Sequence, residues 1–259
     1  RKLFKELFSV SYEGDSYGRP IIGYEDTVKG ITRNDILAYT KKYYRPNNML
    51  IVIVGDFDKK RTEALIKKRA AGIEKAKAKP EKDISKKHIA RKGKVNIKII
   101  EKDVRESYLA LAYRIPSLVH KDIPAIDLLG TILGEGESSR LQEELKNKKG
   151  IVTSISTYVF TPKEEGLFII LANFKGKDYR LIENEIDREI QRLFREGASE
   201  WEITKAKNML NASYIYSAET VQGKARQIGN FQTLTDDPLF VKKFLEASNR
   251  ITGGDIKHA

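Results

Sequence analysis

The stretch from Ile31 to Phe57 constrains the fold of this chain more than any other. Its first part predicts a helix that begins at the cap residue Thr32, with Asp35 three residues later completing a capping box. Pro46 ends that helix, because the residue before a proline avoids the helical region. The six apolar residues Met49–Val54 then run without alternation, which predicts a strand that is buried on both faces.

The opening of this stretch recurs near the end of the chain. Residues 251–256 read Ile-Thr-Gly-Gly-Asp-Ile, and residues 31–36 read Ile-Thr-Arg-Asn-Asp-Ile. The two segments are 220 residues apart, since 251 − 31 = 220. If the similarity reflects a duplication, the chain holds the end of one copy of a unit of about 220 residues and most of the next copy.

The net charge of +12 is concentrated in one segment. From Lys59 to Lys94 there are fifteen Lys or Arg and four Asp or Glu residues, which leaves the remainder of the chain nearly neutral. Such a segment could attract the phosphates of a nucleic acid. Pro80 and the scarcity of large apolar residues in its second half favour a solvated helix end and a linker. The absence of cysteine excludes disulfides, thiolate metal ligands and cysteine nucleophiles.

The remaining patterns predict helices that are segregated from strand pairs, which is typical of an α+β fold. Helices are expected at 2–10, 60–71, 122–133, 140–148 and 182–196, from Ser199 into the 220s, and from Asp237 onward. Strands are expected at 95–99 and 107–115, and 152–160 with 166–174 should form a hairpin. Ser139 and Gln142 should cap the helix over 140–148.

The residues alone do not assemble a complete active site. The histidines His88, His120 and His258 have no second histidine or carboxylate at the spacing of a helical zinc site, so each is expected at the surface. Paired acids in loops, such as Glu164 with Glu165, are more often solvated than catalytic. No apolar run is long enough to span a bilayer, and no signal peptide is visible. Arg1 is not a natural start, so we expect further sequence upstream.

Several motifs in order resemble the pitrilysin/insulinase family of zinc metallopeptidases, and especially its processing-peptidase-like subgroup. They are Ser16–Gly23, Ile31–Asp35, Tyr43–Met49 and Val54–Phe57, followed by Gly134–Leu145, which looks like the family's glycine–serine–arginine–leucine helix start. Each piece is weak, but the ordered set covers essentially the whole chain.

The resemblance implies two homologous α/β-sandwich units in an α+β architecture. Residues 1–72 would be the C-terminal part of the first unit, 73–92 a basic linker, and 93–259 a nearly complete second unit that is not catalytic. In the family, the first unit carries H-x-x-E-H and a distal glutamate, which hold zinc and activate water. Those residues would lie upstream of Arg1, so no catalytic or metal-binding residue is expected in this chain, and zinc is expected only in the full-length protein.

Some members of the family use an arginine–tyrosine pair, seven residues apart, to contact the peptide substrate. The resemblance places this pair on Lys146 and Thr153. Lysine keeps the charge but not the bidentate fork of arginine, and threonine keeps a hydroxyl without the reach of tyrosine. A solvated helix end and an ordinary strand position are the competing interpretations of Lys146 and Thr153.

The sequence therefore predicts the non-catalytic portion of a zinc metalloendopeptidase that encloses extended peptides. The alternatives are a catalytically inactive scaffold or partner subunit, in a homodimer or heterodimer, and a nucleic-acid-binding module acting through residues 59–94. The expected partners are a peptide or protein substrate and the missing N-terminal unit. The sequence does not decide the compartment; a soluble protein of the bacterial cytoplasm or periplasm is the expectation.

Overall fold

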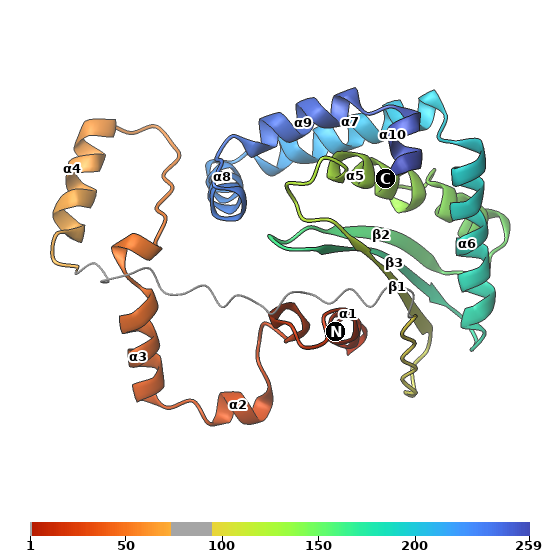
Figure 1. The fold of residues 1–259 in the computed structure, drawn as a ribbon, viewed down its shortest axis with the longest axis horizontal. Coiled ribbons are helices and arrows are strands. Elements are labelled where there is room, and N and C mark those ends of the chain that lie inside the picture. The colour runs from red at the N-terminus through yellow and green to blue at the C-terminus, as the bar shows by residue number, and fades with distance from the viewer. Residues whose placement is uncertain (1, 74–94) are drawn as a thin grey trace. The chain divides into compact units, whose positions relative to one another are not determined.

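The computed structural model describes residues 2–73 and 95–259. Contacts divide the chain into two compact units, Arg1–Ile99 and Ile100–Ala259, which are described separately below (Figure 1). The predicted linker at 73–92 falls, apart from Ile73, outside the described residues, as does His88. Among the helices that the structure describes, none is long and apolar enough to cross a membrane.

The first unit consists of short helices joined by loops and extended segments. They are α1 (Lys2–Ser11), η1 (Ser16–Gly18), α2 (Glu25–Lys29), α3 (Arg33–Tyr43), η2 (Pro46–Asn48) and α4 (Lys59–Ala70). The predicted capping box of α3 is confirmed, because Asp35 N donates to Thr32 Oγ1 at 3.3 Å and Thr32 N donates to Asp35 Oδ2 at 2.8 Å. The predicted helices over 2–10 and 60–71 are confirmed as well.

The predicted buried strand over Met49–Val54 is wrong for the described structure. The segment is irregular and not part of a sheet, and Ile51 is 60% exposed. The predicted half-buried strand at Val95–Ile99 is wrong for the same reason, with Val95 80% exposed. A strand needs a neighbouring strand to complete its backbone hydrogen bonds, and the described part of this unit contains no other strand.

The second unit is built on an antiparallel three-stranded sheet. Its strands are β1 (Ser107–Ile115), β2 (Ser154–Phe160) and β3 (Gly166–Phe174), in the order β1-β3-β2. The register pairs Phe160 with Leu167 and Ile115 with Gly166. The predicted strand over 107–115 and the predicted hairpin are thus confirmed.

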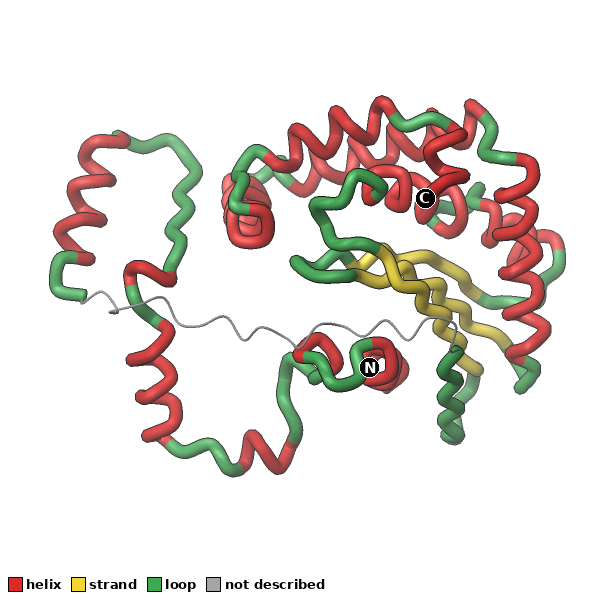
Figure 2. The backbone as a smooth tube through the Cα atoms, in the orientation of Figure 1, coloured by secondary structure: helices red, strands yellow, loops and turns green. Residues whose placement is uncertain are grey.

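Helices cover one face of this sheet in two layers. The helices of this unit are α5 (Ile123–Gly134), the π-helix η3 (Gln142–Lys148), α6 (Tyr179–Glu196), α7 (Glu200–Ser217), α8 (Val221–Thr235), α9 (Phe240–Arg250) and α10 (Gly253–His258). Helix α5 packs directly on the sheet, α7 and α9 pack on α5, and α6 stands at one end (Figures 1 and 2). The helices lie on one side of an antiparallel sheet, and this separation confirms the α+β class expected from the segregated helices and strands.

The core of the second unit lies between the sheet and α5. Alternation along the strands places Leu109 and Leu111 of β1 on the same face as Phe168 and Ile170 of β3. On α5, Leu128 is completely buried in the same hydrophobic core. Burying each such side chain stabilises the fold by about 1.5–3 kcal/mol, so this face holds the unit together.

Two predicted helix boundaries in this region are corrected. The predicted helix from Ser199 into the 220s is two helices, because Thr220 accepts a hydrogen bond from Gly223 N and starts α8 after α7 has ended at Ser217. The last predicted helix starts at Phe240 instead of Asp237. The side chain of Asp237 accepts a hydrogen bond from Leu239 N and so stabilises a turn before the helix. The predicted Ser199 capping box and the end of α6 before Gly197 are confirmed.

The repeated hexapeptides adopt the same local structure. At the start of α10, Asp255 N donates to Thr252 Oγ1 at 3.3 Å and Thr252 N donates to Asp255 Oδ2 at 2.8 Å, the same geometry as at Thr32 and Asp35. The similarity of the two segments therefore extends from residue type to conformation. The homology of the two complete units stays a prediction.

Candidate functional site

The candidate site is built on a close approach of α5 to β2. Thr157 Oγ1 donates a hydrogen bond to the carbonyl of Gly130 at 2.8 Å. At Gly134, one turn later, a Cβ atom would lie 2.5 Å from Thr157 Cγ2 and 2.7 Å from Thr157 N. Only glycine allows this contact, because any other residue would force the helix away from the strand. The contact fixes where the chain leaves α5 and enters the Gly134–Leu145 motif.

The helix that follows has the predicted span but not the predicted start. Ser139 Oγ donates to Gly136 O at 2.7 Å, and Gln142 Nε2 donates to Ile155 O on β2 at 2.7 Å, so these residues do not form a capping box. From Gln142 the helix has π geometry, and Lys149 N donates to Glu144 O at its end. Gln142 bonds to this carbonyl on the sheet instead of capping its own helix. The spacing of residues in the sequence does not predict that partner.

Arg140 anchors this helix to the start of α7. Its guanidinium contacts both carboxylate oxygens of Glu202, at 2.6 and 2.9 Å, and donates to Gly197 O at 2.9 Å. Both side chains are largely buried. The pKa of Glu202 falls to about 2, chiefly because Arg140 donates to its charged form. Sequence reasoning found the Ser199–Glu202 cap but missed this partner, since nothing local links residues 62 positions apart.

The structure does not bring the predicted substrate residues Lys146 and Thr153 to a common partner. Lys146 Nζ lies 3.3 Å from Glu137 Oε2, on the helix surface. Thr153 donates from its backbone N and from Oγ1 to the same carbonyl, Asn173 O, at 2.8 and 3.1 Å. Each residue therefore already makes a contact that stabilises the local fold.

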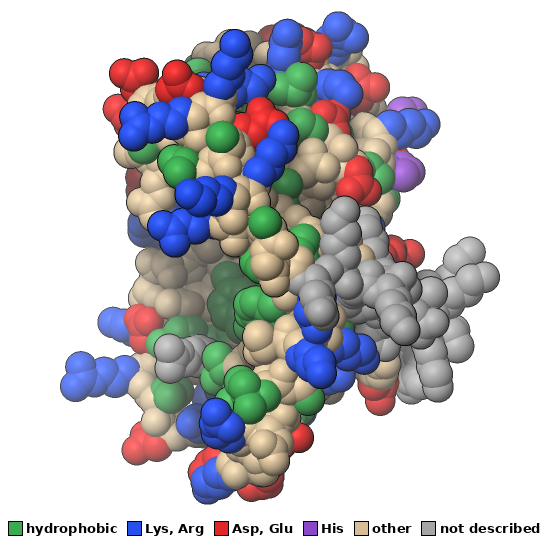
Figure 3. Space-filling model, turned by 90° about the vertical axis from the view of Figure 1, so that its left-hand side faces the viewer, with side chains coloured by type: hydrophobic (Ala, Val, Ile, Leu, Met, Phe, Trp, Pro, Cys, Tyr) green, Lys and Arg blue, Asp and Glu red, His purple; other side chains and the backbone are tan. Residues whose placement is uncertain are grey.

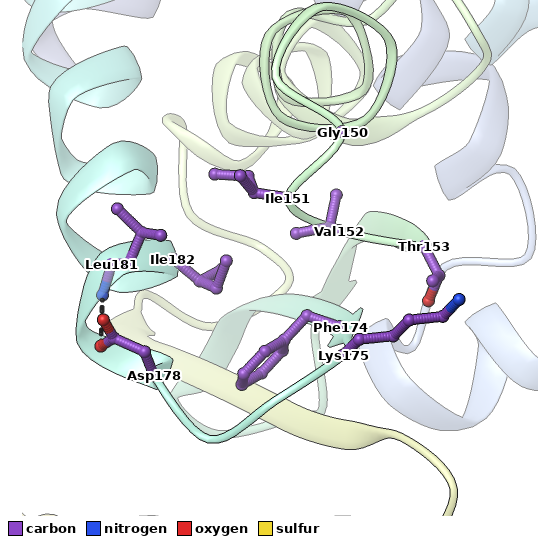
Figure 4. Close-up of a pocket in the computed structure, with 9 residues that line it drawn as sticks. All are labelled: Gly150, Ile151, Val152, Thr153, Phe174, Lys175, Asp178, Leu181 and Ile182. Carbon is purple, nitrogen blue, oxygen red and sulfur yellow. Dashed lines mark hydrogen bonds between the residues drawn. The ribbon is translucent and has the colours of Figure 1, made fainter.

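Thr153 nevertheless lines a pocket of about 300 Å³ between the start of β2 and the start of α6 (Figure 4). Apolar side chains form much of the lining, from Ile151, Val152, Phe174, Leu181 and Ile182. Lys175 and Asp178 are the charged residues of the lining. Asp178 Oδ1 accepts a hydrogen bond from Leu181 N at 3.1 Å and caps α6. The pocket combines an apolar surface with one cation, Lys175, for which the described residues supply no carboxylate partner.

A second pocket, of about 250 Å³, lies among β1, α5, α6 and α10. Tyr113 and Ile115 of β1 line it together with Leu193 and Phe194 of α6. Lys257 Nζ stands 5.3 Å from the centre of the Phe194 ring. The pocket is mainly apolar, and we assign it no ligand.

The described residues contain no group of three or more histidine or acidic side chains placed to hold a metal ion. His120 Nδ1 lies 3.5 Å from Asp122 Oδ2, and His258 is exposed at the end of α10. Of the predicted solvated acids, Glu165 lies 3.6 Å from Arg114. These surroundings give no metal-binding or acid–base geometry in this part of the chain.

Among the described residues on the face drawn in Figure 3, basic and acidic side chains are interspersed. In α4, the described part of the basic segment, Lys67 pairs with Glu63 at 2.7 Å. Residues 74–94 of that segment lie outside the described structure. The nucleic-acid hypothesis therefore gains no support from the described residues.

Comparison with known families settles the affiliation of the chain. The model of the peptidase M16 inactive domain matches residues 30–210. The chain belongs to this family. The resemblance to pitrilysin-type zinc metallopeptidases drawn from the motifs is thereby confirmed, and the Gly134–Leu145 motif lies within the matched M16 segment.

Curated relatives of this M16 chain are proteases or peptidase subunits. The zinc protease PqqE of Helicobacter pylori is 28% identical over 94% of this chain and 56% of its own length. An uncharacterized zinc protease of Rickettsia felis is 25% identical over 98% of this chain and 60% of its own length. The mitochondrial-processing peptidase subunit alpha-2 of Dictyostelium discoideum is 25% identical over 98% of this chain and 57% of its own length. The chain thus spans little more than half of these relatives.

Solved structures share the M16 fold. A protease from Helicobacter pylori superposes with a TM-score of 0.87 at 24% identity, over 97% of this chain and 61% of that chain. A peptidase M16 inactive domain from Pseudomonas fluorescens gives 0.81 at 20% identity, over 98% of this chain and 60% of that chain. These similarities confirm the α+β fold.

Proposed function

We propose that this chain is the non-catalytic portion of a zinc-dependent metalloendopeptidase and helps to enclose extended peptides for cleavage. The match to the M16 inactive domain carries this proposal. The names of the curated relatives support zinc in the full-length protein. That its ligands lie outside this chain is part of the proposal. We retain the predicted organisation as part of the proposal: 1–72 from the first unit, 73–92 as linker and 93–259 as the second unit.

An open sheet edge supports peptide binding. On β2, the outer edge is engaged, because Gln142 donates to Ile155 O and Gly134 packs against Thr157 N. On β1, no strand of the described residues pairs along the edge that faces away from β3. Alternation of the ladder directs the backbone groups of Ala110 and Ala112 toward that edge. An extended peptide can add there as a further strand.

Lys146 and Thr153 are proposed as secondary substrate contacts on the π-helix and at the start of β2. Their present partners, Glu137 and Asn173, would hold them in place while a peptide lies across the surface. Exchange of either residue for alanine should weaken peptide binding without abolishing it, because neither anchors the sheet edge.

The proposal is tested by fluorescence anisotropy of a mixed library of fluorescein-labelled 15-residue peptides. Ala110→Pro removes an edge N–H without disturbing the β1–β3 ladder, and should weaken binding about tenfold. Ala110→Val keeps the N–H and serves as the matched control. Equal affinities of these two variants would contradict edge pairing, and absence of any binding would contradict peptide enclosure.

The zinc assignment is tested by elemental analysis of the chain and by peptide hydrolysis with and without a chelator. We expect neither stoichiometric zinc nor chelator-sensitive cleavage, because the proposed ligands lie outside this chain. Tight zinc binding together with such cleavage would refute the non-catalytic role.

A second candidate is a catalytically inactive scaffold or partner subunit in a homodimer or heterodimer. It is favoured by the relative named mitochondrial-processing peptidase subunit alpha-2. An intact H-x-x-E-H in the full-length protein would favour the peptidase, and its loss would favour the scaffold.

A further inference from the structure

The pocket beside Thr153 has a composition that selects one kind of ligand. Its apolar lining comes from three separate parts of the fold: the loop before β2, the end of β3 and the first turn of α6. Lys175 follows Asn173 by two residues, and Asn173 O accepts both hydrogen bonds from Thr153. The cation and the Thr153 hydroxyl therefore belong to the same part of the lining (Figure 4).

Among the described residues, no carboxylate forms an ion pair with Lys175, although Asp178 also lines the pocket. One oxygen of Asp178 accepts from Leu181 N and its charge faces the N-terminus of α6, where the helix dipole stabilises an anion. Nearby Lys149 contacts Glu185. An incoming anion would be attracted to Lys175.

We propose that this pocket binds the C-terminal residue of a peptide, with an apolar side chain against Ile151 and Phe174 and the α-carboxylate at Lys175. This inference rests on the proposed function and names its substrate class at a defined subsite. A C-terminal apolar residue carries its carboxylate next to its side chain, so both groups fit one pocket of about 300 Å³. An internal Asp or Glu residue would supply a carboxylate but no apolar side chain. A second residue would then have to fill the apolar part of the pocket.

The test compares N-terminally fluorescein-labelled peptides that end in leucine, as free acid or as amide, by anisotropy with the full chain. The free acid should bind at least fivefold more tightly than the amide, and this preference should shrink as salt is raised. Lys175→Gln should remove the preference. Lys177→Gln makes the same charge change two residues away, outside the pocket, and should preserve it.

The possible outcomes distinguish failure of the carboxylate subsite from failure of the proposed function. If acid and amide bind equally well, the carboxylate subsite is refuted while peptide binding stands. If neither peptide binds, both proposals fail. If Lys177→Gln removes the preference as fully as Lys175→Gln, the effect is general surface charge and the subsite is refuted. If dodecanoate displaces the acid peptide at equal concentration, the pocket binds apolar anions in general and its assignment to a peptide terminus is refuted.

Discussion

The Arg140–Glu202 ion pair should make a measurable contribution to the stability of the second unit. Glu202→Gln keeps the shape of the side chain but leaves the buried guanidinium of Arg140 without a counter-charge. The difference between the ordinary pKa of 4.5 and the value of about 2 in the fold corresponds to about 3 kcal/mol. Removing one partner of a buried pair costs a similar amount, about 3–5 kcal/mol. We therefore expect the free energy of unfolding to fall by about 3 kcal/mol at pH 7.

The Arg140–Glu202 pair also makes the free energy of unfolding depend on pH. Because the pKa of Glu202 is lowered in the fold, its contribution is complete above the unfolded value of 4.5 and is lost as the pH falls toward about 2. The difference in stability between native protein and Glu202→Gln should consequently narrow from pH 5 to pH 2.

Urea unfolding followed by fluorescence and far-ultraviolet circular dichroism measures this effect. Trp201 is the single tryptophan of the chain and adjoins Glu202, so its emission reports on this unit. Glu200→Gln is the matched control, because Glu200 is exposed in the same helical turn and should cost less than about 1 kcal/mol. An equal loss in both variants, or a loss from Glu202→Gln that is the same at pH 7 and pH 2, would refute the reasoning.

Three further changes have defined outcomes. Gly134→Ala should destabilise the fold by about 2 kcal/mol in urea unfolding, because the new Cβ would overlap Thr157. Asp127→Asn should raise the free energy of unfolding by about 4 kcal/mol at pH 8, because burial raises the pKa of Asp127 to about 7 and each pKa unit corresponds to about 1.4 kcal/mol. The native protein loses this stability as the pH rises from about 4 to 7, and thermal unfolding at several pH values measures it. Thr252→Ala should cost about 1 kcal/mol through loss of the α10 cap, measured by urea unfolding.

Each of these predictions has a control in the same chain. Gly72→Ala meets no atom within 4 Å and should be nearly neutral. Asp187→Asn alters an exposed carboxylate, so it should give no increase in stability that grows as the pH is raised. Thr32→Ala removes the equivalent cap of α3 and should cost the first unit about as much as Thr252→Ala costs the second. A stabilising Gly134→Ala, or a pH-independent effect of Asp127→Asn, would contradict the packing described for α5.

Features that depend on neighbouring residues could be predicted before the fold was known. The capping boxes at Thr32 and Ser199, the end of α6 at Gly197 and the position of strand β1 were all predictable. In each, the groups that form the hydrogen bonds or share a face lie within a few positions of one another. The ordered motifs also pointed to the correct family.

Features that join distant segments became visible in the folded chain alone. The partner of Arg140 lies 62 residues away, Gln142 bonds to a carbonyl on β2 instead of capping its own helix, and the pocket lining at Lys175 is assembled from three parts of the chain. Met49–Val54 shows the converse: its composition favours a strand, yet it forms none among the described residues. Backbone and charged groups gain their stabilisation from whichever partner the fold brings near, and local spacing does not encode that partner.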